Sequence, residues 1–476
     1  MAEPRRRQVR PALLALGRRT RQVLLLAAIT GVLTGAGVAA FEWVAREQLF
    51  HWMRERSQPV QIAAPTVGLM LAALCLRYLS GRASPATADE YIRSFHDPVN
   101  RLDLRPVAGR LLASVATLGL GGAMGYEGPS IYLGASIGSW LQRKLSRFFS
   151  REDAKVLLVC GAAAGVAAIF KAPATGLVFA LEVPYQEDLA RRMLLPAGIA
   201  AAASYVTFVA FAGTTPLFAV SGSPPFNLRD LGGAAVLGVA CGVGARLFAT
   251  ALARAKHVAA TVHPLARAAV AGGVLSGLAA LSFRLFGDGL TLGAGYDNLR
   301  WAFDPHRALG LVLALLLMRA LATIVTVAGG GVGGLFIPLV IEGALMGRLM
   351  QGLFRIGITG SNFFPLVGVS AFLGAGYRVP LAGVVFAAEA TGRPGFIVPG
   401  LIAAVVAQLF MGRASASPYQ MPARLGHLER RFALPVSAVL WADIPVVPPD
   451  TTLAEFFWQH LVVNREREVP VVDGAS

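Results

Sequence analysis

Apolar stretches separated by short polar loops dominate the chain, and they restrict its fold more than any other feature. They lie at roughly residues 22–46, 60–79, 105–124, 155–183, 194–213, 230–253, 267–287, 308–329, 332–353, 363–390 and 396–412. A helix needs about 20 apolar residues to cross a bilayer, and several of these stretches are shorter or are interrupted by Gly and Pro. Broken helices are tolerated at membrane depth only where they line a cavity or are buried in protein. The pattern predicts an all-α polytopic membrane protein.

The charge distribution supports this class and excludes others. Charged residues make up 15% of the chain, and Lys plus Arg (43) exceed Asp plus Glu (27) by 16. The low fraction of charged residues excludes a soluble enzyme and a disordered protein. The Arg residues gather at the chain ends and in loops, so we expect no nucleic-acid partner. Residues 1–21 hold seven Arg and predict a cytoplasmic basic arm, with both termini cytoplasmic and the chain in a cell (inner or plasma) membrane. The three Cys are expected to be small buried side chains, and neither a metal site nor a cofactor is predicted.

The two halves of the chain resemble one another. Residues 30–41 match residues 237–248 at an offset of 207, and residues 173–182 (PATGLVFALE) match residues 380–389 (PLAGVVFAAE) at the same offset. We infer a duplication, with a first membrane repeat over 22–215, a linker over 216–229 and a second repeat over 230–425. Many transporters are built from such repeats, and the substrate site lies between them. The repeat is inverted if each half crosses the membrane an odd number of times, and the sequence leaves that parity open.

The segment Gly-Tyr-Glu-Gly-Pro-Ser at 125–130 predicts an anion site within the membrane. Gly125 and Gly128 permit an unusual backbone, and Pro129 suits the first turn of a helix, whose free N–H groups and positive dipole end attract anions. Glu127 beside it can fill the site itself and must leave when it is protonated. The alternative is a carboxylate that neighbouring amides satisfy, with no gating role.

The segment Gly-Leu-Phe-Ile-Pro at 334–338 is the repeat partner of 125–130 and predicts a second helix start. The backbone N–H groups of Phe336 and Ile337 are the expected donors to an anion. The alternative here is a glycine hinge in a packed helix.

These motifs resemble those of the chloride channel/transporter (CLC) family. Gly-Tyr-Glu-Gly-Pro resembles its GxEGP motif and Gly-Leu-Phe-Ile-Pro its GxFxP motif, and both stand in family order across about residues 20–425. The resemblance implies a homodimer in a lipid bilayer, with two inverted repeats and an anion pathway for chloride in each subunit. It also implies that Glu127 is the external gate and that Tyr419 donates its hydroxyl to the anion.

The sequence departs from the family's pattern at two places. The family's GSGIP motif is missing, and residues 81–92 read GRASPATADEYI, so Ser84 or Thr87 is expected to supply the missing hydroxyl. Val183 stands where the family's proton-coupled exchangers carry an internal glutamate. Because Val183 cannot hold a proton, the sequence favours a passive chloride channel gated by protonation of Glu127. The alternative is an H⁺/Cl⁻ exchange transporter of the same fold with another internal proton route. Glu187 and Asp188 lie close by as candidates to replace the glutamate, although we expect them in a solvated loop.

The remaining motifs point away from catalysis. Residues 426–476 are expected to form a cytoplasmic linker and part of a CBS-like domain, with a helix capped by Asp450 and Thr451, and we expect this fragment to bind no nucleotide. Gly134-Ala135-Ser136-Ile137-Gly138 matches a hydrolase pattern, but it lies in an apolar helix with no His nearby to act as base. We therefore expect no enzyme, and the small residues are interpreted as helix-packing positions.

Overall fold

The computed structural model describes residues 4–81, 83–97, 102–146, 149, 155–215, 227–354, 362–423, 447–458 and 471. The chain divides into two compact units, Met1–Ala423 and Arg424–Ser476. The predicted linker at 216–229 lies mostly outside the described residues.

Eight helices of the described chain are long and apolar enough to cross a membrane, so the protein is an integral membrane protein. They span Arg21–Arg54, Gln58–Leu79, Arg191–Ala212, Leu228–Ala260, Pro264–Phe286, Leu309–Ala328, Phe336–Phe354 and Pro394–Met411. Shorter apolar helices lie between them, as the interrupted stretches predicted. The all-α polytopic fold is confirmed.

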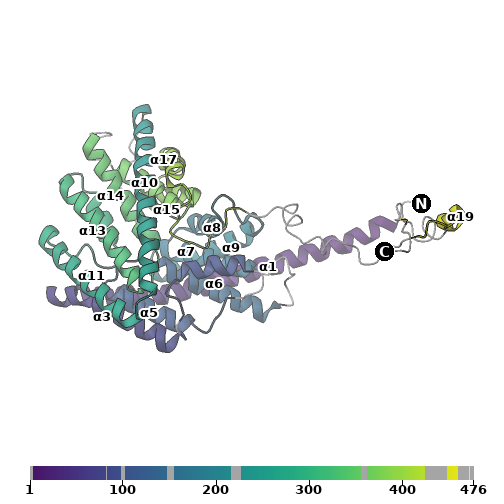
Figure 1. Cartoon of the computed structure of the whole chain (residues 1–476), viewed down its shortest axis with the longest axis horizontal. Helices are drawn as coiled ribbons and strands as arrows, with labels where there is room; N and C mark the ends of the chain where they lie inside the picture. Colours follow the sequence, from purple (N-terminus) through teal and green to yellow (C-terminus); the bar gives the residue numbers. More distant parts are fainter. Residues whose placement is uncertain are drawn as a thin grey trace. The chain divides into compact units, whose positions relative to one another are not determined.

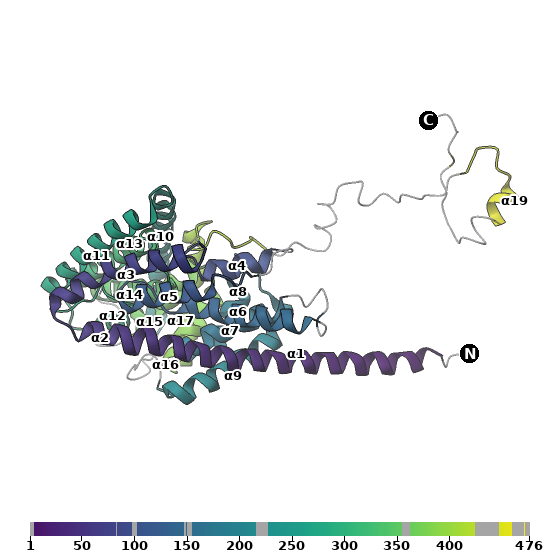
Figure 2. The same ribbon diagram turned by 90° about the horizontal axis from the view of Figure 1, so that it is seen from below.

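The first repeat contains the following elements: α1 (Pro4–Glu42), a π-helical continuation (Trp43–Phe50), α2 (His51–Arg54), α3 (Gln58–Leu79), α4 (Ala88–His96), α5 (Val107–Gly119), α6 (Glu127–Lys144), α7 (Val156–Phe170), α8 (Pro173–Glu182), a 3₁₀ turn (Arg191–Met193) and α9 (Leu194–Ala212). The second contains α10 (Leu228–Ala260), α11 (Pro264–Phe286), α12 (Tyr296–Ala302), α13 (Leu309–Ala328), α14 (Phe336–Phe354), α15 (Phe363–Gly376), α16 (Pro380–Thr391), a 3₁₀ turn (Pro394–Phe396) and α17 (Ile397–Met411). In Figure 1, α10, α13 and α14 of the second repeat lie side by side. In Figure 2, α1 and α9 run together along one side of the first.

The breaks between helices fall where Gly and Pro predicted them. Helix α5 ends at Gly119 and α6 begins at Glu127, with Pro129 in its first turn. Helix α13 ends at Ala328 and α14 begins at Phe336, with Pro338 in the equivalent position. Proline fits there because the N–H groups of a first helical turn have no partner within the helix.

Reciprocal hydrogen bonds join the two repeats at their centre. The Gly125 N–H donates to the Gly334 carbonyl at 2.9 Å, and the Gly334 N–H donates back to Gly125 at 2.7 Å. The two segments therefore run antiparallel where they meet. A second reciprocal pair lies beside them, because Thr326 Oγ1 accepts from Ala123 N–H and Thr117 Oγ1 accepts from Val332 N–H. Equivalent residues paired in opposite directions relate the two repeats by a local two-fold rotation, as expected of inverted repeats.

Small residues let the helices approach closely. A Cβ added to Gly134 in α6 would collide with the Gly161 carbonyl of α7, and one added to Gly343 in α14 would collide with the Gly368 carbonyl of α15. A Cβ at Gly138 would collide with the Leu157 carbonyl. The Gly134–Gly138 motif is thus a helix-packing motif, as predicted.

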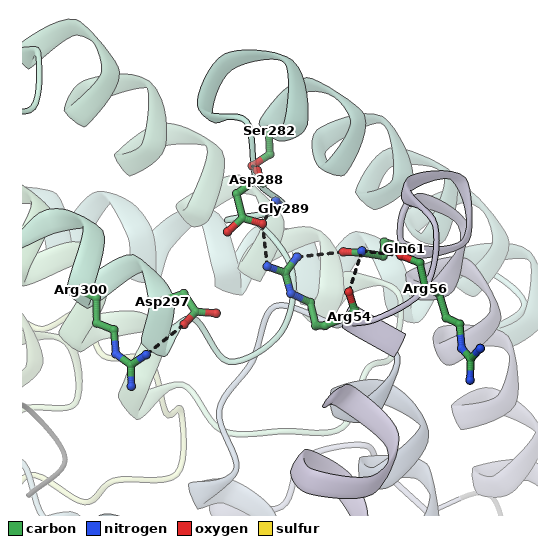
Figure 3. A network of polar contacts seen from close by, with 8 residues as sticks. All are labelled: Arg54, Arg56, Gln61, Ser282, Asp288, Gly289, Asp297 and Arg300. Atoms are coloured by element: carbon green, nitrogen blue, oxygen red, sulfur yellow. Dashed lines mark hydrogen bonds and ion pairs between the residues drawn. The ribbon is translucent and has the colours of Figure 1, made fainter. Parts of the chain in front are cut away.

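Polar contacts hold the loop between α11 and α12 against the first repeat (Figure 3). Arg54, at the end of α2, donates to Asp288 Oδ1 at 2.6 Å and to Gln61 Oε1 at 2.9 Å. The Gly293 N–H of the same loop donates to the Gly121 carbonyl at 2.9 Å. This loop, Gly287–Gly295, therefore touches the segment that leads into the start of α6.

The described part of the second unit is short. Val447 and Val471 form a parallel bridge, and α19 (Leu453–Phe456) lies between them in sequence. The N-cap of α19 is Thr452, which accepts from the Glu455 N–H, so the prediction of Asp450 and Thr451 as caps was wrong by one residue or two. The CBS-like assignment itself stays a prediction.

Candidate functional site

The carboxylate of Glu127 lies at the first turn of α14, in the position of a bound anion. Its Oε1 accepts the Phe336 N–H at 2.6 Å and the Ile337 N–H at 3.3 Å. Glu127 is 1% exposed, and its Oε2 has no hydrogen-bond partner. The two N–H groups and the positive end of the α14 dipole favour a negative charge here. Helix starts of this kind can hold a carboxylate or another small anion.

Glycine is required around this carboxylate because there is no room for a side chain. A Cβ on Gly125 or on Gly334 would overlap the carboxyl group of Glu127. A Cβ on Gly128 would lie 2.6 Å from Thr87 Oγ1 and 2.6 Å from the Gly333 carbonyl. The glycines that the sequence analysis singled out thus let backbone from both repeats approach the site.

Of the two predicted hydroxyls, the structure brings only Thr87 to the site. Thr87 is buried at the start of α4, and its hydroxyl donates to the Gly333 carbonyl at 3.4 Å. Ser84 is exposed, and its Oγ accepts the Ala86 N–H at 3.2 Å within its own loop.

Aromatic rings enclose the first turn of α14 on the side of α8 and α16. The Phe336 ring lies 4.4 Å from Phe170, 5.4 Å from Phe179 and 4.8 Å from Phe386, measured between ring centroids. These rings are buried, so the surroundings on this side of the site are apolar. Hydrogen bonds and charges are stronger in such an environment than in water.

Tyr419 is not buried at this site, whereas another tyrosine is. The Tyr419 side chain is 44% exposed. Tyr377, at the end of α15, is buried, and its hydroxyl contacts the backbone of Leu335, directly before α14. Its ring meets that of Phe179 edge-on at 5.7 Å.

Tyr377 and Gln420 are the neighbours of the site that the sequence analysis missed. Gln420 is buried, and its Nε2 donates to the carbonyls of Val183 at 2.9 Å and Tyr377 at 2.7 Å. The repeat held a signal for Tyr377, because it lies 207 positions after Phe170, another ring of the site. Nothing in the sequence singled out Gln420.

Val183, which stands where the family's exchangers carry an internal glutamate, is buried and apolar. Val183 follows α8 and is 1% exposed. Glu187 is exposed as predicted, whereas Asp188 is mostly covered and accepts the Leu189 N–H.

Among the described residues, no group of three or more His, Cys, Asp or Glu side chains is placed to hold a metal ion.

Two further glutamates hold helix starts of the opposite repeat. Glu182 of α8 accepts the N–H groups of Leu381 and Ala382 at the start of α16. Glu389 of α16 accepts the N–H groups of Ala174 and Thr175 at the start of α8, together with the Thr175 hydroxyl. Both carboxylates satisfy the free N–H groups of a first turn and so support these helix ends.

Two inverted helical repeats with a carboxylate and facing helix starts at their junction define a membrane transport protein of the two-repeat type. The family profile described as "Voltage gated chloride channel" matches residues 67–412. The chain therefore belongs to the voltage gated chloride channel (CLC) family.

Curated relatives and solved structures agree with this assignment. The chain is 25% identical over 418 residues to the H(+)/Cl(-) exchange transporter ClcA of Yersinia pseudotuberculosis, covering 82% of this chain and 85% of the relative. It is 26% identical to the protein of the same name from Klebsiella pneumoniae, covering 81% and 85%. The fold matches a slow cyanobacterial Cl⁻/H⁺ antiporter with a TM-score of 0.72 at 22% identity, covering 82% and 94%. It also matches a CLC-type fluoride/proton antiporter with a TM-score of 0.74 at 24% identity, covering 85% and 98%.

Proposed function

We propose that this protein transports chloride across a membrane in exchange for protons. One observation carries the proposal: a buried carboxylate that can take up a proton occupies an anion position at the first turn of α14. A group of this kind links anion binding to protonation, because only its charged form competes with an anion for the same N–H donors.

The mechanism follows from that competition. With Glu127 ionised, its carboxylate holds the Phe336 and Ile337 N–H groups and closes the site. Protonation removes the charge, the side chain leaves, and chloride accepts the two N–H groups in its place. Loss of the proton returns the carboxylate and displaces the chloride. Exchange results when the proton reaches Glu127 from one side of the membrane and leaves to the other, while the displaced chloride crosses in the opposite direction.

Further groups are assigned to the anion's surroundings. Thr87 supplies the hydroxyl expected in place of the missing serine, with Gly125 and Gly128 keeping the approach open. Tyr419 remains the tyrosine that the resemblance predicts as a donor to the anion. Tyr377 is a second candidate for that role, because its hydroxyl lies against the backbone directly before α14.

Passive conductance, which the sequence analysis favoured, is the second candidate function. The buried Val183 supports it, since an apolar side chain cannot pass a proton onward from Glu127. The relatives' names support exchange instead, and their similarity extends over most of the chain. We therefore place exchange first.

The assembly and orientation belong to the same proposal. We expect a homodimer with one anion pathway in each subunit, and both termini in the cytoplasm of a cell. Each of these expectations rests on the family resemblance or on the placement of Arg residues.

The deciding experiment is chloride efflux from proteoliposomes loaded with chloride, with the external pH recorded in the same vessel. Exchange predicts proton uptake that accompanies chloride efflux and continues against a proton gradient. Chloride efflux without coupled proton movement would support passive conductance instead. Absence of chloride flux in vesicles that contain the correctly folded protein would contradict both functions.

A further inference from the structure

A buried carboxyl group in α14 takes no part in the site described above. Glu342 is 2% exposed, and its Oε1 has no hydrogen-bond partner. Ionisable side chains buried in membrane proteins are usually functional. Helices α6, α10, α12, α13 and α15 pack on α14, and the charged side chain among them whose field acts on Glu342 is Arg319 of α13.

Arg319 is buried as well, but its hydrogen bonds go elsewhere. Its Nη1 donates to the carbonyls of Thr291 and Gly293, both at 3.1 Å, and its Nη2 donates to Ala294 at 3.2 Å. Its Nε has no partner. The guanidinium thus holds the Gly287–Gly295 loop and faces Glu342 without bonding to it. Burying two such charges costs free energy unless further hydrogen bonds satisfy their remaining polar atoms.

Other buried polar atoms beside Arg319 also lack partners. A Cβ on Gly295 would lie 2.7 Å from Arg319 Nη2 and 2.8 Å from Asn298 Nδ2, so these two side chains meet at Gly295. Both polar atoms of the Asn298 side chain are without a hydrogen bond. So are the hydroxyls of Thr291 and of Thr323, which lies one turn after Arg319 on α13. We name these five residues the Arg319 cluster: Thr291, Asn298, Arg319, Thr323 and Glu342.

The chemistry of the unpaired atoms identifies the ligand. Arg319 Nε and Asn298 Nδ2 can only donate, whereas Glu342 Oε1 and Asn298 Oδ1 accept. An anion would leave the acceptors unpaired, and a metal ion would leave the donors unpaired. Water both donates and accepts, and buried water typically makes about three such bonds to otherwise unsatisfied groups.

We propose that the Arg319 cluster is a buried water site and that Glu342 exchanges a proton with this water. Water molecules bridge the Glu342 carboxylate to Arg319 Nε–H and to the Asn298 amide. A hydronium ion entering the cluster gives its proton to the carboxylate and remains as water, and the reverse step releases the proton. Glu342 is then a second proton-binding group of the protein, apart from Glu127.

The cluster lies close to the anion site along two connections. Glu342 is six residues beyond Phe336 on the same helix, about 9 Å along its axis. The loop held by Arg319 also donates the Gly293 N–H to Gly121, in the segment before α6, and Arg54 fixes the other end of the loop at Asp288 (Figure 3). A change of charge at Glu342 therefore acts on the helix and the loop that border Glu127.

Infrared difference spectroscopy of the purified protein in lipid, between acidic and alkaline buffer, tests the proposal. The wild-type spectrum should contain a carboxylic-acid band that Glu342→Gln abolishes. Asn298→Leu, which removes two of the bridging atoms with little change of volume, should shift that band in frequency. Glu182→Gln is the matched control, because both oxygens of Glu182 already accept backbone N–H groups, and it should leave the band in place.

The proposal is overturned if Glu342→Gln gives the wild-type difference spectrum. It is also overturned if an experimental density map that resolves ordered water shows none among the five side chains. Neither measurement depends on transport, so a failure here is distinct from a failure of the exchange function.

Discussion

Replacing Glu127 by glutamine removes one negative charge from the first turn of α14 and changes the shape of the side chain little. The carboxylate accepts two N–H groups there, at 2.6 and 3.3 Å. Hydrogen bonds to charged groups contribute about 1.5–3 kcal/mol and neutral ones about 0.5–1.5 kcal/mol, so the change weakens each bond by about 1–1.5 kcal/mol. The helix dipole, which favours the charged form, adds to this loss.

The sum of the two bonds is about 2–3 kcal/mol, which lowers occupancy of the site by the side chain about 30- to 150-fold. Chloride then competes with a much weaker occupant. We expect Glu127→Gln to transport chloride at the same rate across the acidic and alkaline range. Chloride transport by the wild type should instead become slower as the pH rises, because ionised Glu127 closes the site.

The assay is chloride efflux from proteoliposomes at a series of pH values, with chloride binding to the detergent-solubilised protein measured by calorimetry. Asp297→Asn is the control, since it removes a charge from an exposed side chain whose ion-pair partner, Arg300, is also exposed, and it should leave the pH dependence unchanged. Steep pH dependence that persists in Glu127→Gln would refute the assignment of Glu127 as the gate.

Three further changes probe the site and the scaffold. Tyr377→Phe should weaken chloride binding about fivefold if its hydroxyl donates to the anion, since one hydrogen bond contributes about 1 kcal/mol. Tyr419→Phe is its counterpart, and a loss in that variant alone would assign the role to Tyr419. Glu389→Ala removes three hydrogen bonds and should destabilise the protein by about 3 kcal/mol, seen as a lower unfolding temperature in detergent. Gly134→Ala should lower that temperature as well, whereas Gly273→Ala, which meets no atom within 4 Å, should not; equal effects would contradict the close helix contact.

The fold was predictable from the sequence because its causes are local and repeated. Apolar length predicted the spanning helices, and Gly and Pro predicted where they break. The offset of 207 predicted the duplication. The sequence could not reveal the inversion, because that depends on how Gly125 and Gly334 pair in space.

The candidate site was predictable in part. Glu127, Phe336 and Ile337 were found because each repeat carries a recognisable helix start. Thr87 and Ser84 could not be separated, since only the packing of α4 shows which hydroxyl reaches Gly333. Tyr377 was missed for a similar reason, because α15 brings it to α14 from 41 residues further along the chain. Contacts between distant segments leave no local pattern.

The exchange of helix caps between the repeats has a consequence for biosynthesis. The start of α8 obtains its acceptor from Glu389, and Glu182 finds its donors only in α16. The α8 motif and its repeat partner in α16 are separated by 207 residues, and a ribosome needs about 10–40 s to translate that length. During that time the newly inserted first repeat holds a carboxylate and a helix end in the bilayer with no partner. We therefore expect the first half of the chain, made alone, to be a substrate for membrane quality control, and co-expression of the second half to rescue it.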